Sequence, residues 1–266
     1  MYPIIIDKYK IIFFYSPKCG CSSLKKYCIA ICPKYSTIEK NVTIEPHNFV
    51  DVDTLKVHKV ITADPIDSLE RYKFYKKILI SRDPYERSVS AFIYVMHYFE
   101  INKKINCDND DFSKHFLENL CGSDNSCSNL YPLIIEFKML PSFRNFIKIL
   151  NAINIEKADP HISPQSHCYC SCNITKNDLD EIVDLKKLNE RLKKLNEELN
   201  VDCLVENINA THHSEKSINM CDIDIVEYGK INNNVYPKWI YFYDKDIKKM
   251  VYNIYKSDFN LLNQVG

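Results

Sequence analysis

Two continuous apolar runs stand out along the chain, and each is followed at once by polar residues that favour turns. The first covers residues 11–15 (Ile-Ile-Phe-Phe-Tyr), and the second is the apolar centre, Ile78 to Ile80, of residues 77–81 (Lys-Ile-Leu-Ile-Ser). Short apolar runs with β-branched and aromatic residues are typical of buried strands. The pattern therefore predicts two buried strands, and a helical pattern follows each of them.

Apolar residues recur at helical spacing in several other segments. The clearest is residues 141–153, where four apolar side chains share one face: Phe143, Phe146, Ile147 and Leu150. The other predicted helices cover residues 25–32, 64–76, 84–99, 112–121 and 246–262. Strands that alternate with helices are typical of α/β proteins, and the chain shows no repeat or low-complexity linker. We therefore expect one α/β domain over residues 1–266.

A loop of small residues follows the first predicted strand. Residues 16–23 are Ser-Pro-Lys-Cys-Gly-Cys-Ser-Ser, and a helical pattern begins at Leu24. Between a strand and a helix, the backbone amides of such a loop point at a ligand and the helix dipole favours negative charge. The loop is a candidate anion site with Lys18 as its cation, although a lysine in such a turn is also compatible with a solvated surface residue. It is not a Walker A motif, because the lysine does not stand directly before the hydroxyl residue.

The second predicted strand is followed by an arginine and a helix start. Residues 82–92 are Arg-Asp-Pro-Tyr-Glu-Arg-Ser-Val-Ser-Ala-Phe. Asp83 suits the N-cap and Pro84 the first helical turn, so Arg82 lies at a strand end, where ligands bind in open α/β sheets. A guanidinium can bind two phosphate oxygens, and Ser90, about two turns into the helix, can add a hydroxyl. An ordinary capping pair of Arg82 and Asp83 is the alternative.

Both segments resemble sequences of the carbohydrate sulfotransferases, which use 3′-phosphoadenosine-5′-phosphosulfate as the sulfate donor. The order Pro-Lys-x-x-x-Ser-Ser at residues 17–23 resembles their 5′-phosphosulfate loop, and residues 82–92 resemble the segment that binds the donor's 3′-phosphate. Residues 159–172 resemble a third segment, D-x-H-W-x-P-Q-x-x-x-C-x-x-C, in which Ile162 replaces the usual aromatic residue. Residues 255–259 resemble the closing Y-x-x-D-[FY] of the family.

The resemblance implies a P-loop-type parallel sheet flanked by helices. It also bears on residues 178–199, where leucines at helical spacing indicate one long helix but Ile182 and Val183 suit a strand. In the resembled family a strand comes first. We therefore expect a strand over residues 179–185, followed by a helix.

The resemblance further implies in-line transfer of a sulfuryl group to a hydroxyl, most often on a sugar, by positioning and charge stabilisation. Lys18 would neutralise the charge that grows on the bridging oxygen, and Arg82 with Ser90 would bind the 3′-phosphate. The 5′-phosphate and sulfonate oxygens would contact the loop residues, which are Lys18, Cys19, Gly20, Cys21, Ser22 and Ser23. Magnesium is not required in this family, and the sequence shows no carboxylate cluster that would require a metal. The expected partner is a glycan or another hydroxyl acceptor.

A general base must remove the proton of the acceptor. His58 is the first candidate, because the heparan sulfate 2-O-sulfotransferase branch carries a histidine base in the segment before the second strand. His161 is the alternative, since it lies in the third family segment. Each is also compatible with a structural or surface histidine.

Charge and cysteine content limit the partners and compartments. The 35 basic and 35 acidic residues cancel, which argues against a nucleic-acid or membrane-surface binder. No signal peptide or membrane-spanning run is visible, which favours the cytoplasm, whereas the 12 cysteines and the resemblance favour the Golgi lumen. A zinc site is the less favoured interpretation of the clustered cysteines, Cys168, Cys170 and Cys172, with His161 and His167, because C-x-C-x-C lacks the usual C-x-x-C spacing. Disulfides or buried thiols suit them better.

Two other functions stay open. A nucleoside or nucleotide kinase on a related fold would need the Walker A lysine position and metal-binding carboxylates, and the sequence lacks both. A catalytically inactive relative that binds a glycan or another partner would keep the fold without the chemistry. The presence of Lys18, Arg82 and Ser90 argues against that loss of activity.

Overall fold

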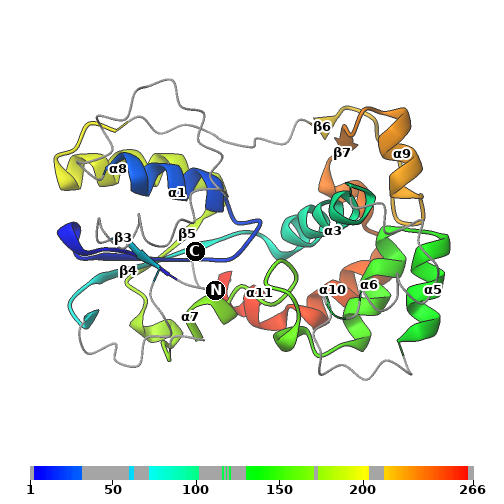
Figure 1. Cartoon of the computed structure of the whole chain (residues 1–266), viewed down its shortest axis with the longest axis horizontal. Helices are drawn as coiled ribbons and strands as arrows, with labels where there is room; N and C mark the ends of the chain where they lie inside the picture. The colour runs from blue at the N-terminus through cyan, green and yellow to red at the C-terminus, as the bar shows by residue number, and fades with distance from the viewer. Residues whose placement is uncertain are drawn as a thin grey trace. The chain divides into compact units, whose positions relative to one another are not determined.

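The fold was established from a computed structural model, which describes residues 3–31, 60–62, 72–101, 116, 118, 120, 130–170, 173–203 and 213–262. The chain forms two compact units, each assembled from separate segments (Figure 1). The first takes in residues 1–82, 165–210 and 265–266, and the second takes in residues 83–164 and 211–264. Because each unit is assembled from separate stretches, this division does not cut the chain into two successive domains. The single domain expected from the sequence stays a prediction.

A five-stranded sheet forms the centre of the first unit, in the order β3-β1-β2-β4-β5. The strands are β1 (Ile4–Ile6), β2 (Ile11–Tyr15), β3 (Val60–Thr62), β4 (Lys76–Ser81) and β5 (Glu181–Asp184). β2 pairs in parallel with β4, and β4 pairs in parallel with β5. The predicted α/β fold with a mostly parallel sheet is confirmed, and both predicted buried strands are present.

β1 departs from the parallel arrangement, since it pairs antiparallel with both β2 and β3. The cause is the short connection between β1 and β2, which consists of the 3-10 turn Asp7–Tyr9 and then Lys10 with a left-handed φ of 55°. A parallel pair needs a crossover of about a dozen residues or more, so this turn can only reverse the chain.

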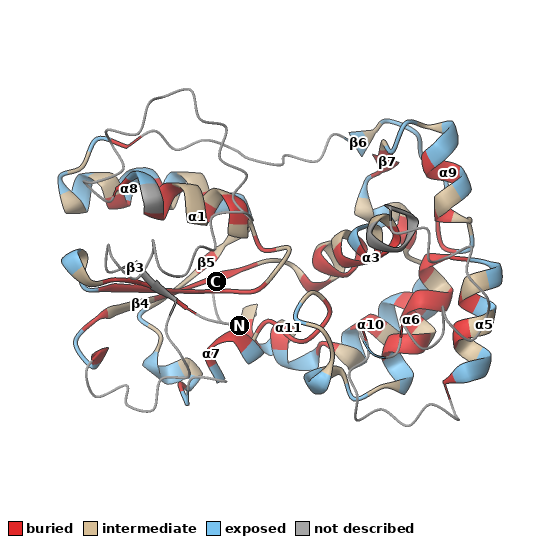
Figure 2. Cartoon of the chain, viewed as in Figure 1, coloured by how far each residue is buried: buried red, intermediate tan, exposed pale blue. Residues whose placement is uncertain are grey.

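Two helices cover one face of the sheet, α1 (Cys21–Ala30) and α8 (Leu188–Leu199) (Figure 1). Leu24 of α1 and Leu192 of α8 are buried against strand residues such as Phe13 and Ile80. Because side chains alternate along a strand, Phe14 points to the opposite face, where it is fully buried as well. Figure 2 shows this burial along the strands. A continuous apolar run is thus explained by a sheet that is covered on both faces.

The conflict over residues 178–199 is resolved in favour of a strand followed by a helix. Val183 is buried in β5, and the Asp184 carboxylate accepts a hydrogen bond from Lys186 N at 2.7 Å, which starts the 3-10 turn Leu185–Lys187. The leucine pattern then continues in α8, so periodicity alone places the helix start too early.

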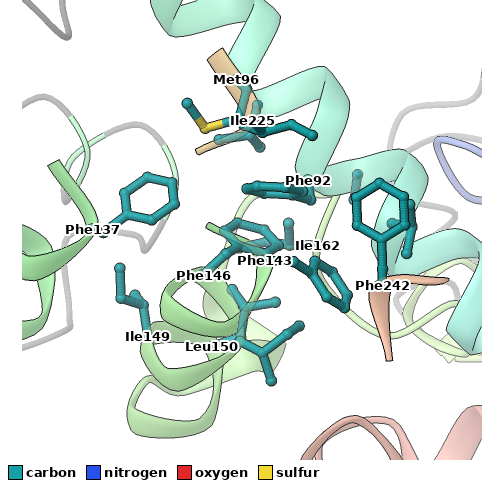
Figure 3. Close-up of a cluster of buried hydrophobic side chains, with 14 of the residues drawn as sticks. Phe92, Met96, Phe137, Phe143, Phe146, Ile149, Leu150, Ile162, Ile225 and Phe242 are labelled. Carbon is teal, nitrogen blue, oxygen red and sulfur yellow. The ribbon is translucent and has the colours of Figure 1, made fainter. Parts of the chain in front are cut away.

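The second unit is mainly helical. Its helices are α3 (Pro84–Ile101), α5 (Tyr131–Met139), α6 (Phe143–Ala152), α9 (Ile225–Ile231), α10 (Lys245–Ile254) and α11 (Lys256–Leu262). Two short strands, β6 (His213–Ser214) and β7 (Tyr236–Pro237), pair in parallel. The aromatic side chains of Phe92, Phe143 and Phe146 pack in its core (Figure 3). The predicted amphipathic helix is confirmed as α6, with all four of its proposed apolar residues buried.

The predicted C-terminal helix is divided in two at Tyr255. This residue is 1% exposed, and its hydroxyl donates a hydrogen bond to Ile162 O at 2.7 Å. Its backbone, with φ −110° and ψ 31°, leaves the helical conformation and ends α10.

Two other predicted helices lie largely outside the described residues. Of the predicted helix at 64–76, residues 64–71 are not described and residue 76 belongs to β4. Of the predicted helix at 112–121, only residues 116, 118 and 120 are described. In the parts of the chain that the structure describes, no helix is long and apolar enough to cross a membrane.

Candidate functional site

The loop after β2 turns directly from the sheet into a helix. Cys19 N donates to Ser16 O at 3.1 Å, which closes the turn, and Leu24 N donates to Gly20 O at 3.1 Å, which opens α1. Cys21, Ser22 and Ser23 therefore form the first turn of the helix. Backbone amides in a first helical turn lack partners within the helix, and they are aligned with the positive end of its dipole. The loop thus joins a strand to a helix N-terminus, as the sequence predicted, and anion binding there stays a prediction.

Two residues of this loop have left-handed backbones, Lys18 with φ 68° and Gly20 with φ 75°. The conformation is easy for glycine but costs a lysine about 1–2 kcal/mol. A Cβ atom on Gly20 would collide with Leu185 Cδ1 and would lie 3.3 Å from Leu188 Cδ2. The loop therefore passes close to the segment that follows β5, and its one lysine is held in a strained position.

Arg82 directly follows β4 and contacts this loop. Tyr15 lies opposite Ile80 in the parallel β2–β4 pair, so the residues beyond both strands leave the sheet at the same edge. Arg82 Nη1 donates a hydrogen bond to the Lys18 carbonyl at 3.0 Å. The structure thus brings together Lys18 and Arg82, the two cationic residues that the sequence proposed from separate segments.

A third residue, Gln165, connects the two segments, and sequence reasoning gave it no role. It is fully buried, and its Oε1 accepts hydrogen bonds from Arg82 N at 2.8 Å and from Cys19 Sγ at 3.0 Å. Its Nε2 donates to Arg82 O at 2.8 Å. The available signal was its place in the Pro-Gln pair of the third family segment, just before α7 (His167–Cys170).

The helix start after Arg82 has the predicted cap. Asp83 Oδ1 accepts hydrogen bonds from Tyr85 N at 2.8 Å and from Glu86 N at 3.1 Å, and Pro84 is the first residue of α3. Ser90 lies on the second turn of α3, in the second unit, and is partly buried. Its predicted contact with a phosphate stays a prediction.

His161, the alternative base, lies in the second unit with an aspartate beside it. Its Nδ1 is 2.7 Å from Asp159 Oδ1, and its ring stacks on Tyr94 with 4.2 Å between the ring centroids. Arg87, buried in α3, donates to the His161 carbonyl at 3.3 Å. An imidazole that donates Nδ1–H to a carboxylate keeps Nε2 as the acceptor, as a general base requires, but the same contacts also suit a structural histidine. His58 lies outside the described residues.

Metal ligands were a further possibility raised by the clustered cysteines. Cys168 is buried and Cys170 is exposed, while Cys172 lies outside the described residues. Within the described ranges, no three His, Cys, Asp or Glu residues gather as a group that could hold a metal ion.

Comparisons with known proteins found relatives that are named as carbohydrate sulfotransferases. A carbohydrate sulfotransferase 10 of Rattus norvegicus is 36% identical over 89 residues, which cover 33% of this chain and 24% of that protein. Its Homo sapiens counterpart is 35% identical over a stretch with the same coverage. A carbohydrate sulfotransferase 12 of Xenopus laevis is 24% identical over 217 residues, which cover 76% of this chain and 49% of that protein. The chain therefore spans about a quarter to a half of the length of these curated relatives. No solved structure gives a significant match.

A comparison with protein families covers more of the chain. The sulfotransferase family matches residues 3–263, a range that includes the loop after β2, the segment after β4 and both helices of the C-terminal region. The match covers nearly all of the chain, and the resemblance first seen in short segments is thereby confirmed. The chain belongs to the sulfotransferase family.

Proposed function

We propose that this protein transfers the sulfuryl group of 3′-phosphoadenosine-5′-phosphosulfate to a hydroxyl group of a carbohydrate. The observation that carries this proposal is the hydrogen bond of 3.0 Å between Arg82 Nη1 and the Lys18 carbonyl. It joins, at one edge of the sheet, the two segments for which we propose anion binding, and a donor with charged groups at both its 5′ and 3′ positions would need two such segments close together. Family membership supports the transfer of sulfate, and the names of the relatives support the carbohydrate acceptor.

The loop after β2 would bind the 5′-phosphosulfate. Its contacts would come from the backbone amides of residues 19–23 and from the Ser22 and Ser23 hydroxyls, with the Lys18 ammonium beside them. Oxyanions are bound well at a helix N-terminus, because the amides and the dipole act together. The Lys18 ammonium would stabilise the negative charge that develops on the bridging oxygen as the bond between sulfur and that oxygen breaks.

Arg82 and Ser90 would bind the 3′-phosphate. A guanidinium has five N–H donors, so the contact with the Lys18 carbonyl is compatible with a second, bidentate contact to a phosphate. The Ser90 hydroxyl would add a neutral donor. A donor nucleotide without the 3′-phosphate would therefore bind more weakly.

The acceptor hydroxyl would attack sulfur as its proton passes to a histidine. His58 remains the first candidate on the strength of the family resemblance, and His161, whose Nδ1 contacts Asp159, is the alternative. In either case the proton moves to an imidazole nitrogen, and adenosine 3′,5′-bisphosphate leaves.

A ligand-binding experiment tests the donor. Adenosine 3′,5′-bisphosphate should raise the melting temperature of the protein, because a ligand that binds only the folded state stabilises it by mass action. ATP with magnesium should raise it much less. The reverse order would favour a nucleotide kinase and overturn the proposal. A screen of glycan acceptors with donor labelled in the sulfate would then identify the acceptor, and failure to label any hydroxyl compound despite bisphosphate binding would indicate an inactive relative.

A further inference from the structure

We propose that Gln165 is a positioning residue that holds the Lys18 loop and Arg82 at a fixed separation and so makes recognition of the 5′ and 3′ groups of one nucleotide cooperative. The inference rests on the proposed function, because it assumes that the two segments bind two groups of the same donor. Gln165 itself would contact neither group.

The Gln165 amide makes contacts that no other side chain of similar length can reproduce. Its Nε2 donates to Arg82 O and its Oε1 accepts from Arg82 N, both at 2.8 Å, so the amide pairs with the backbone of Arg82 as a neighbouring strand would. The same Oε1 accepts from Cys19 Sγ at 3.0 Å. One planar group thus fixes the residue after β4 and the loop after β2 together.

Burial makes the loss of these hydrogen bonds costly. Gln165 and Cys19 are both fully buried, so water is not at hand to replace a lost partner, and a buried polar group without its partner costs more than an exposed one. A methionine has nearly the length of glutamine but neither donor nor acceptor of useful strength, and a glutamate lacks the N–H that Arg82 O accepts.

The side chain of Arg82 adds a second connection to the same loop. Its Nη1 donates to the Lys18 carbonyl at 3.0 Å, so the backbone of Arg82 is tied to Cys19 through Gln165 while its side chain is tied to Lys18 directly. Lys18 has a strained φ of 68°, which the surrounding contacts must maintain. The two cationic residues are therefore set relative to one another before a ligand arrives.

Preorganisation of this kind has a specific consequence for binding. When two subsites are held at the spacing of one ligand, binding at the first raises the effective concentration at the second. Loss of the spacing then lowers the affinity for a ligand that occupies both subsites and leaves the affinity for a ligand that occupies only one nearly unchanged. A residue that merely supports the fold would weaken all ligands alike.

The experiment compares three ligands by calorimetry: adenosine 3′,5′-bisphosphate, adenosine 5′-monophosphate and adenosine 3′-monophosphate. In Gln165→Met, the affinity for the bisphosphate should fall by about tenfold or more beyond the fall for either monophosphate, the scale of a lost effective concentration. With donor as the varied substrate, KM should rise by a similar factor and kcat should change less. As a control, Asn145→Leu removes another buried amide, which donates to Leu140 O at 3.1 Å in the second unit, and should leave the ratio of affinities unchanged.

A second pair of variants decides the matter if Gln165→Met does not fold. Cys19→Ala removes the donor to Gln165 and should lower the preference for the bisphosphate, and Cys19→Ser, which supplies a hydroxyl donor, should restore part of it. Equal weakening of all three ligands would overturn the positioning role, and so would an unchanged preference for the bisphosphate in Gln165→Met or, if that variant does not fold, in Cys19→Ala. Wild-type protein that binds the bisphosphate no more tightly than the monophosphates would overturn the proposed function itself.

Discussion

Arg82 Nη1 donates a hydrogen bond to the carbonyl oxygen of Lys18 over 3.0 Å, although the two residues are 64 positions apart in the chain. Each of them follows one of two neighbouring parallel strands, β2 and β4. Because the carboxyl ends of parallel strands share one edge of a sheet, the topology alone brings the two segments close together. The hydrogen bond adds a consequence for mutagenesis, since Arg82 shapes the Lys18 loop as well as the phosphate site proposed for it.

Replacement of Arg82 by Ala should therefore affect two kinds of ligand to different extents. Affinity for adenosine 3′,5′-bisphosphate should fall by about 2–4 kcal/mol, the scale of a lost charge-assisted contact. Affinity for adenosine 5′-monophosphate should fall less, through the lost support of the Lys18 carbonyl. Arg82→Lys should recover only part of the loss, because an ammonium lacks the planar fork of a guanidinium. Calorimetry measures both affinities, and equal losses for the two ligands would assign Arg82 a structural role only.

Two substitutions of Lys18 should have the same effect on activity but different effects on stability. Lys18→Ala and Lys18→Gly should both abolish most turnover, because both remove the ammonium. At φ 68°, however, alanine keeps the backbone strain and glycine relieves it. Lys18→Gly should therefore be more stable than Lys18→Ala by about 1 kcal/mol, even though glycine usually costs stability.

Urea denaturation of the two Lys18 variants provides the measurement. Lys10, with φ 55° in the turn before β2, offers a matched control, because Lys10→Gly and Lys10→Ala should show the same order of stability without loss of turnover. If alanine at position 18 proves as stable as glycine, the loop does not hold Lys18 under strain.

Gly20 should tolerate no side chain. With φ 75° and Leu185 Cδ1 too close to the position that a Cβ would take, Gly20→Ala should lower the free energy of unfolding by about 1–3 kcal/mol. In the double variant with Leu185→Ala, part of this cost should disappear, because the clash is removed and only the backbone strain remains. Additive costs in the double-mutant cycle would show that the two residues do not interact.

Signals contained in neighbouring residues made much of the fold and of the site predictable. The Asp83-Pro84 pair predicted the start of α3, because an N-cap and a first-turn proline act locally. The apolar run Ile11–Tyr15 predicted β2, because a strand covered on both faces needs no alternation. The resemblance was needed where local signals conflicted, as at the junction between Glu181–Asp184 and Leu188–Leu199.

Features that depend on distant partners were not predictable in this way. Gln165 pairs with Arg82, 83 residues earlier in the chain, and no periodicity records such a contact. The division of the C-terminal helix at Tyr255 depends on a hydrogen bond to Ile162, 93 residues away. The reversal of β1 is a local feature that was missed for another reason: the tight turn at Asp7–Tyr9 contains neither glycine nor proline, and Asp7 alone is a weak turn signal.

The second unit should lose stability at acid pH through Asp244. This carboxylate caps α10 and pairs with Arg144. Burial acts to raise its pKa, but the hydrogen bonds from Ile247 N and Arg144 outweigh burial, so the pKa lies below its ordinary value. A carboxylate with a lowered pKa in the folded state stabilises above the unfolded-state pKa of about 4, and the contribution is lost as the pH falls through the folded-state pKa.

Asp244→Asn tests this origin of acid sensitivity. The variant should be less stable than wild type at neutral pH, and the difference should shrink as the pH falls below about 4. Asp246→Asn, a change in the exposed first turn of the same helix, is the control and should shift the curve less. Denaturation followed by circular dichroism across pH gives both curves, and parallel curves for wild type and Asp244→Asn would contradict the assignment.

Replacement of His58 should mainly lower kcat, whereas replacement of His161 should mainly lower stability. His58→Ala should reduce kcat by about 10²–10⁴-fold, the usual contribution of a general base, with little change in donor affinity. His161 stacks on Tyr94 and pairs with Asp159, so His161→Ala should mainly lower stability, by about 1 kcal/mol for the lost ring contact. Steady-state kinetics and thermal denaturation of both variants make the comparison, with Asp159→Asn as the companion to His161→Ala. A large loss of kcat in His161→Ala and Asp159→Asn, without one in His58→Ala, would transfer the role of the base to His161 Nε2.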